Sequence, residues 1–155
     1  MSEFFVRNPG YEVDLREGFA RQSLMSSIGA RLEHVAPGEV DIGLDARADL
    51  LQQNGFVHAG VLTSIADSAC GGAAITLMPP DSDVLSIEFK VNLLAPAAAP
   101  RFVARARVLR AGKTITVCRA DIFGVDGEGK ETLVATMLGT MMTRSRSGSA
   151  EQRNS

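Results

Sequence analysis

The chain has 155 residues, of which 45% are hydrophobic and 22% are charged, and its formal net charge is -2. This is the usual composition of one globular domain with its own core, and it argues against a disordered, collagen-like or coiled-coil protein. The small net charge gives no overall attraction to nucleic acid or to an anionic membrane, so neither is expected as a partner. The charged start lacks a signal peptide and no apolar run could span a membrane, which favours a cytoplasmic protein.

The first part of the chain is predicted to form a helix and a hairpin. Residues from about 11 to 27 place apolar side chains at roughly helical spacing among charged ones, and Gly29 is a plausible end for this helix. Residues 31–35 and 40–44 flank Ala36-Pro37-Gly38 and alternate in polarity as half-buried strands do. The apolar residues assigned to the helix are Leu15, Phe19, Leu24 and Met25.

A long apolar helix is predicted from about 58 to 77, where Met78-Pro79-Pro80 ends it because proline lacks a backbone donor. About twenty helical residues would span some 30 Å. One side of this helix is a wide apolar stripe of Val61, Leu62, Ile65, Ala66, Ala69, Ala73 and Leu77. The opposite side carries mostly small residues, which leave room for a ligand or a second subunit, namely Gly60, Thr63, Gly71, Ala74 and Met78, together with the acid Asp67.

The remainder of the chain is predicted to form long antiparallel strands. Residues 86–93 alternate with period two, and the segments 102–109, 114–123 and 132–143 are separated by turns at 111–113 and 126–129. From Ser145 the chain has too little apolar content to fold and is predicted to be a mobile tail. The order of elements predicts an α+β domain in which a sheet wraps one central helix, and exposed sheet edges favour a dimer.

Cys70 and Cys118 lie in a predicted helix and a predicted strand, outside any CxxC or Cys/His ligand pattern. We expect two buried, reduced thiols rather than a disulfide or a nucleophile. No metal site is predicted.

Three segments resemble the hotdog-fold acyl-CoA thioesterases of the phenylacetate-degradation type, within the 4-hydroxybenzoyl-CoA thioesterase superfamily. These segments are residues 54–62, 66–71 and 86–96, and the resemblance extends from about 50 to 143. It implies a single hotdog domain over residues 1–144, followed by a tail over 145–155. It also implies homodimers joined through a continuous sheet, often paired into homotetramers, with active sites at the dimer interface. The implied substrate is an acyl-CoA, and coenzyme A enters as part of it, so no separate cofactor is expected.

The resemblance assigns roles to individual residues. His58 matches the histidine that opens the helix, Asp67 the carboxylate that acts as nucleophile or general base, and Ser86 the family's serine or threonine on the next strand. Family members commonly carry an asparagine six residues before the histidine, where this chain has Gln52 with Gln53 beside it, so either glutamine could hold the water or the thioester.

The helix entrance could stabilise the charge that develops in thioester hydrolysis. The tetrahedral intermediate needs fixed donors at its oxygen, and the N–H groups of Ala59 and Gly60 lie in the first turn, unpaired within the helix. Asn54 is predicted to be a further substrate-binding residue. The usual His-Gly-Gly is His-Ala-Gly here, and an alanine in helical conformation still presents its N–H. Ser86 is expected to assist Asp67 from the partner subunit.

Structural explanations compete with each of these roles. His58 could be a helix-entrance histidine satisfied by backbone, Asp67 could pair with an arginine, and Ser86 could be a solvated strand residue. The cationic residues of one hairpin could meet coenzyme A phosphates or simply form a solvated face: Arg101, Arg105, Arg107, Arg110 and Lys113. Two other functions stay open, a hydratase or dehydratase of acyl thioesters and a module that binds acyl-CoA without turnover.

Overall fold

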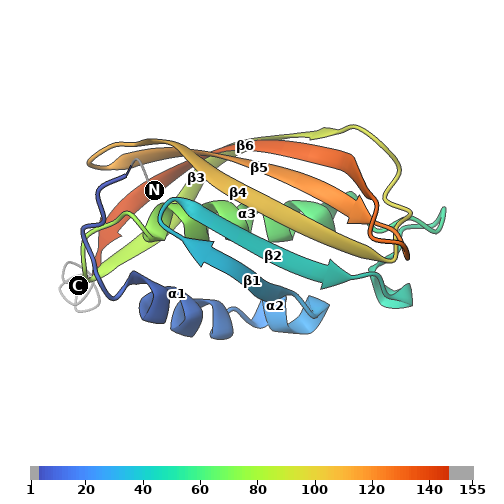
Figure 1. Ribbon diagram of the computed structural model, residues 1–155, viewed down its shortest axis with the longest axis horizontal. Coiled ribbons are helices and arrows are strands. Elements are labelled where there is room, and N and C mark those ends of the chain that lie inside the picture. Colours follow the sequence, from blue (N-terminus) through green and yellow to red (C-terminus); the bar gives the residue numbers. More distant parts are fainter. Residues whose placement is uncertain (1–3, 147–155) are drawn as a thin grey trace, which may run out of the picture.

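The computed structural model describes residues 4–146 and shows a six-stranded antiparallel sheet curved around one long helix (Figure 1). The strand order is β1-β2-β4-β5-β6-β3. This arrangement confirms the predicted α+β fold. The elements in chain order are α1 (Tyr11–Ala20), α2 (Ser23–Ile28), β1 (Arg31–Ala36), β2 (Glu39–Asp45), the 3₁₀ helix η1 (Ala48–Leu50), α3 (Ala59–Ile75), β3 (Ser82–Leu93), β4 (Arg101–Ala111), β5 (Ile115–Val125) and β6 (Glu131–Ser145).

The prediction of one helix over residues 11–27 is wrong, because the chain forms two helices separated at Arg21 and Gln22. The break resets the helical phase, so that Met25 and Ile28 reach the core although they are out of step with Leu15. Leu24, assigned to the apolar stripe, is 55% exposed. Gly29 ends α2 in the left-handed conformation, with φ of 75°, as the sequence predicts.

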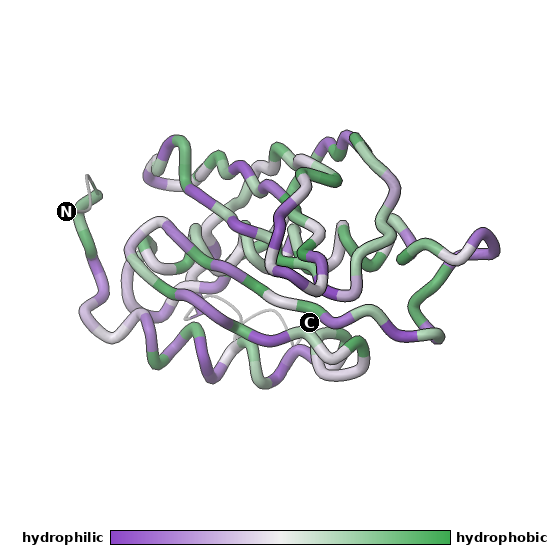
Figure 2. Tube along the Cα trace, turned by 45° about the vertical axis from the view of Figure 1, so that its right-hand side comes forward, coloured by the Kyte–Doolittle hydropathy of each residue, from purple (hydrophilic) through white to green (hydrophobic). Residues whose placement is uncertain are grey.

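The hairpin of β1 and β2 forms as predicted. Val40, Ile42 and Leu44 are completely buried against α3, while Glu39 and Asp41 are half-buried and Asp45 is exposed. Gly38 turns the chain with φ of 76° and donates its N–H to Thr76 Oγ1 at 2.8 Å, which joins the hairpin to the end of α3. The alternation of hydrophobic and hydrophilic residues along the strands can be followed in Figure 2.

Helix α3 forms the centre of the core and ends at Ile75, two residues before the predicted end. Its apolar stripe is buried as predicted except at Val61, which is half-buried, but Gly71, Ala74 and Met78 on the side predicted to be open are buried as well. Only the first half of that side, from Gly60 to Asp67, reaches the surface. The prediction is wrong for the second half, because the sheet wraps around the end of the helix and β3 closes over it, with Val84 Cγ1 3.6 Å from a Cβ built on Gly71.

The two cysteines are buried and reduced, as expected. Cys118 Sγ lies 3.5 Å from the carbonyl oxygen of Cys70. A hydrogen bond between the two side chains, together with burial, raises the pKa of the Cys70 thiol. The Cys70 thiol is therefore a protonated core residue without nucleophilic character.

Strand β3 forms one edge of the sheet and pairs only with β6. It begins at Ser82, four residues before the predicted start, and β6 continues to Ser145, the first residue of the predicted tail. Arg146 is the last described residue, and residues 147–155 of that tail lie outside the described residues. The apolar residues of β3 that remain exposed are Leu85, Ile87, Phe89 and Leu93, with exposed fractions between 41% and 60%.

No helix within residues 4–146 is long and apolar enough to cross a membrane.

Candidate active site

The entrance of α3 is capped by His58. Its backbone is extended, with φ of -61° and ψ of 136°, and its Nδ1 accepts the N–H of Gly60 at 2.8 Å. Its own N–H donates to the carbonyl of Leu50 at 2.9 Å. His58 thus takes the place of a conventional N-cap side chain and fixes the direction in which the loop enters the helix.

The two N–H groups predicted to bind an oxyanion differ in availability. The Gly60 N–H, predicted to be unpaired within the helix, donates to the side chain of His58 and is not free in this structure. The N–H of Ala59 makes no hydrogen bond to any residue in the range 4–146. Ala59 is the first residue of α3, and it therefore places one free donor at the positive end of the helix dipole.

The loop before His58 holds the two glutamines. Gln52 donates its N–H to the carbonyl of Phe56 at 2.8 Å, and Gly55 turns the loop with φ of 85°. The side-chain oxygen of Gln52 accepts the N–H of Asn54, which leaves the Gln52 amide NH₂ as a donor. Gln53 is exposed.

A cavity of about 540 Å³ opens beside this loop. Asn54 does not line it, but the N–H of Asn54 donates to the side-chain oxygen of Gln52, which does. The sequence analysis did not identify Phe56, Leu93 and Leu94, which form an apolar wall of this cavity. The sequence pattern that could have indicated this wall is the presence of large apolar residues near Pro96. The cavity is lined by Gln52, Gln53, Phe56, Val57, His58, Ala59, Leu62, Leu93, Leu94, Ala95, Pro96, Ala97 and Val134.

Asp67 and Ser86 form a second polar group, between α3 and β3. Ser86 Oγ donates to Asp67 Oδ1 at 2.6 Å and also lies 3.3 Å from Met141 Sδ. Asp67 is half-buried and makes no ion pair with a described lysine or arginine. The contact with Ser86 is made within one chain, which corrects the expectation that the serine comes from the partner subunit.

The two parts of the candidate site are separated within one chain. Asp67 follows Ala59 by eight residues, which corresponds to about 12 Å along a helix. Neither Asp67 nor Ser86 lines the cavity at the helix entrance. A single carbonyl therefore cannot contact both the Ala59 N–H and the carboxylate of the same chain.

The surface of α3 between the two parts is polar and carries short side chains. Thr63 Oγ1 donates to the carbonyl of Ala59 at 2.8 Å, and Ser64 Oγ donates to the carbonyl of Gly60 at 2.7 Å. Because both hydroxyls bend back onto their own helix, this face offers little side-chain bulk. Another protein surface can approach it closely.

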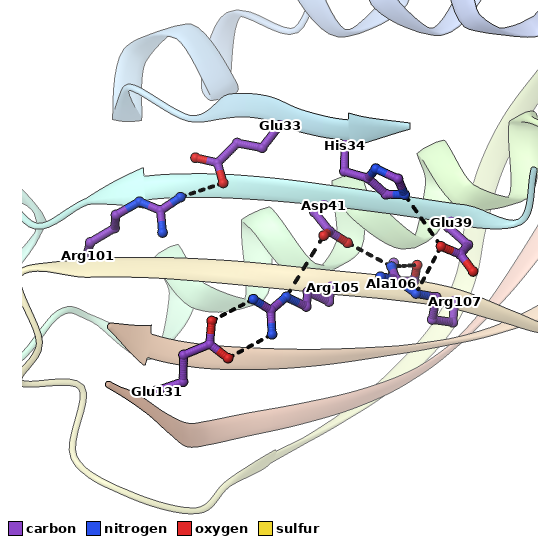
Figure 3. Close-up of polar contacts among 9 residues, drawn as sticks. All are labelled: Glu33, His34, Glu39, Asp41, Arg101, Arg105, Ala106, Arg107 and Glu131. Carbon is purple, nitrogen blue, oxygen red and sulfur yellow. Dashed lines mark hydrogen bonds and ion pairs between the residues drawn. The ribbon is translucent and has the colours of Figure 1, made fainter. Parts of the chain in front are cut away.

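The arginines of the β4–β5 hairpin lie on the outer face of the sheet, where most of them are neutralised (Figure 3). Arg105 makes two hydrogen bonds to Glu131, at 2.6 and 2.8 Å, and lowers the pKa of that carboxyl. Arg107 pairs with Asp41 at 2.7 Å, and Arg101 pairs with Glu33. This network favours the solvated face over a phosphate-binding patch.

The residues 4–146 contain no cluster of three or more histidine, cysteine, aspartate or glutamate side chains that could hold a metal ion.

A curved antiparallel sheet wrapped around one long helix is the architecture of the hotdog fold. The model of the thioesterase superfamily matches residues 54–130. The structure of a thioesterase family protein from Silicibacter pomeroyi is 43% identical, covers 86% of this chain and 98% of its own, and superposes with a TM-score of 0.84. The chain therefore belongs to the thioesterase superfamily and is a thioester hydrolase acting on acyl-CoA, and the predicted hotdog fold is confirmed.

Two further relatives support this assignment. A mutant of the phenylacetic acid degradation protein PaaI from Thermus thermophilus is 30% identical, with 78% of this chain and 98% of that chain covered and a TM-score of 0.68. A 1,4-dihydroxy-2-naphthoyl-CoA hydrolase from Listeria monocytogenes is 29% identical, with 61% of this chain and 76% of that protein covered.

Proposed function

We propose that this acyl-CoA thioesterase works as a homodimer whose two active sites each combine two chains. One chain supplies the helix entrance, with Ala59 and Gln52, and the other supplies Asp67 with Ser86. The observation that carries the proposal is the distance of about 12 Å along α3 between the free N–H and a half-buried carboxylate that pairs with no lysine or arginine of residues 4–146. A second copy brings the two parts together without any change inside either chain.

The exposed edge strand β3 supports this geometry. Pairing of β3 with its copy would continue the sheet and cover Ile87, Phe89 and their apolar neighbours, since an unpaired apolar edge favours association. A two-fold axis at this edge makes the contact isologous and sets the two α3 helices antiparallel. Asp67 of one chain then lies opposite the helix entrance of the other.

The chemistry follows from these positions. The thioester carbonyl accepts the Ala59 N–H, so the charge that develops on its oxygen meets a fixed donor at a helix N-terminus. Asp67 either takes a proton from an attacking water or attacks the carbonyl itself, and Ser86 holds its carboxylate by a hydrogen bond. In the first route the hydroxide adds to the carbonyl carbon, the C–S bond breaks, and the proton passes from Asp67 to the departing sulfur of coenzyme A.

The other residues orient these groups. His58 holds the Gly60 N–H and thereby the entrance of the helix, while Gln52 or Gln53 positions the water or the thioester. The reaction so written needs no metal or bound cofactor. Buried reduced thiols at Cys70 and Cys118 fit a reducing compartment, so a cytoplasmic location is part of the proposal.

Mixed dimers test the shared site. Asp67→Asn and Ala59→Pro each damage a different part, and a hybrid of the two variants has one site with both changes and one site with neither. We expect each variant to be nearly inactive alone and the purified hybrid, separated by two affinity tags, to recover roughly half the native rate, because one of two sites is intact. A site built within one chain would leave both sites of the hybrid damaged, so an inactive hybrid dimer would contradict the proposal.

The alternatives make different predictions. A module that only binds acyl-CoA would bind it without releasing free thiol from any acyl-CoA. A hydratase or dehydratase would change the acyl chain and leave the thioester intact.

A further inference from the structure

The turn of α3 that carries Asp67 is tied to two neighbouring parts of the chain. On one side, Ser86 of β3 donates a hydrogen bond of 2.6 Å to Asp67 Oδ1. On the other side, Oγ of Ser68, the next residue of α3, donates a hydrogen bond of 2.9 Å to Oε1 of Gln22, which lies between α1 and α2. The second bond connects this turn to a part of the chain that precedes the segment matched by the family model.

The hydroxyl of Ser68 is used differently from the hydroxyls one turn earlier. Thr63 and Ser64 each donate to a backbone carbonyl four residues before them in α3. This is a common arrangement for serine and threonine inside a helix. Ser68 instead donates to a side chain 46 residues away in the sequence. Its bond therefore fixes α3 relative to another element, which a bond to its own helix would not do.

The backbone of Gln22 is held by both of the helices it joins. Its N–H donates to the carbonyl of Phe19 at 3.0 Å, and its carbonyl accepts the N–H of Ser26 at 3.2 Å. Gln22 is the N-cap residue of α2, a position where Ser, Thr, Asp or Asn usually bonds to the first turn. Its side chain makes no such capping bond. The side chain of Gln22 thus serves α3 and not its own helix.

The helices α1 and α2 are themselves anchored to the core. Leu15 of α1 and Met25 and Ile28 of α2 are buried. Leu15 Cδ1 would lie 3.2 Å from a Cβ built on Gly72, so the glycine allows α1 to approach α3 closely. Because these contacts hold the two helices against α3, Gln22 offers Ser68 an acceptor in a fixed place.

We propose that Gln22 is a positioning residue for thioester hydrolysis. Through Ser68 it fixes the turn of α3 that carries Asp67, and so sets the direction of the carboxylate toward the thioester, without touching the substrate itself. This inference rests on the proposed function, since it requires Asp67 to act on the thioester. In the proposed dimer the partner subunit covers this face of α3, and a hydrogen bond shielded from water is electrostatically stronger than an exposed one.

A double-mutant cycle tests this role. We measure kcat and KM for Gln22→Ala, Ser68→Ala and the double variant, with whichever of acetyl-, octanoyl- and phenylacetyl-CoA the native protein hydrolyses fastest. We expect each single variant to lower kcat by about threefold to tenfold with KM unchanged, because one hydrogen bond is lost and no substrate contact is lost. The double variant should lose no more than a single one, since both changes remove the same bond. Losses that multiply, a rise in KM alone, or a native kcat in the folded single variants would each overturn the inference.

Two further variants separate positioning from a general loosening of the N-terminal helices. Asn8→Ala removes a side-chain amide bond of 2.8 Å to Asp14 that does not reach α3, so kcat should stay at the native value. Ser68→Thr keeps the hydroxyl and should retain most of the native kcat. A loss in Asn8→Ala equal to that in Gln22→Ala, or a loss in Ser68→Thr equal to that in Ser68→Ala, would overturn the inference while thiol release by the native protein left the proposed function intact. No thiol release from any of the three substrates by the native protein would overturn the proposed function, and this inference with it.

Discussion

The two parts of the candidate site, the Asp67–Ser86 pair and the entrance of α3, differ in how many of the groups they need are supplied by one chain. The Asp67–Ser86 pair is finished within the chain, with a hydrogen bond of 2.6 Å and partial burial between α3 and β3. The helix entrance has a free N–H and two amides around a cavity of about 540 Å³, but no group there can attack or activate water except the exposed His58, whose Nδ1 is engaged. The Asp67–Ser86 pair therefore supplies a carboxylate but no donor for the carbonyl oxygen of a substrate. The helix entrance supplies such a donor but no carboxylate.

The proposed division of the active site between two chains would control reactivity. A carboxylate that meets a thioester only in the dimer has no substrate carbonyl within reach in the monomer.

Loss of the carboxylate should have the largest effect. Asp67→Asn keeps the size of the side chain but cannot take a proton or form an acyl intermediate, so kcat should fall by about 10²- to 10⁴-fold. Release of coenzyme A with a thiol reagent measures the rate, and thermal unfolding checks that the variant still folds. A rate close to that of the native protein would remove Asp67 from the reaction.

Removal of the free donor at the helix entrance should come next. Ala59→Pro deletes one N–H at the first helical position, where proline fits, and the extended backbone of His58 suits a residue before proline. We expect kcat to fall about 10²- to 10³-fold, as for the loss of one oxyanion donor. Ala59→Ser keeps the N–H and serves as the matched control. If both variants lose activity equally, the effect comes from the side chain and not from the donor.

Removal of the hydroxyl beside the carboxylate should have a smaller effect. Ser86→Ala deletes a hydrogen bond to a charged group, which is worth about 1.5–3 kcal/mol, so a fall in kcat of about tenfold or more is expected. Ser86→Thr keeps the hydroxyl and should retain most of the rate. Equal loss in the two variants would show that packing of β3, rather than the hydrogen bond, is responsible.

The two glutamines should give the smallest effects and can be told apart. Gln52 is half-buried and held by Asn54, whereas Gln53 is exposed. We expect Gln52→Ala to lower kcat/KM by about tenfold, because a fixed amide is preorganised, and Gln53→Ala to change it by less than about threefold. The reverse order would assign the amide role to Gln53.

Much of the fold could be predicted from the sequence, because it depends on local periodicity. The unbroken alternation of residues 86–93 and the turns near Gly38, Gly112 and Gly127 determine the strands, and the prolines after Met78 limit the long helix. The sequence also placed Asp67 and Ala59 correctly on their helix, since spacing along one helix decides which face a residue occupies. Ser86 lies on the predicted strand, but a β-bulge between Ser86 and Glu88 interrupts the predicted alternation and turns Ser86 toward α3.

Tertiary structure alone decided the remaining features. The break at Gln22 depends on contacts of Met25 and Ile28 with the core, and the burial of Gly71 depends on β3 closing over α3; neither distant contact leaves a local pattern. The hydrogen bond from the Gly60 N–H to His58 depends on the direction of the histidine side chain. The hydrogen bond between Ser86 and Asp67 of the same chain depends on how β3 crosses the helix. Sequence determines which groups a segment carries, while the packing of segments far apart along the chain determines which of those groups meet.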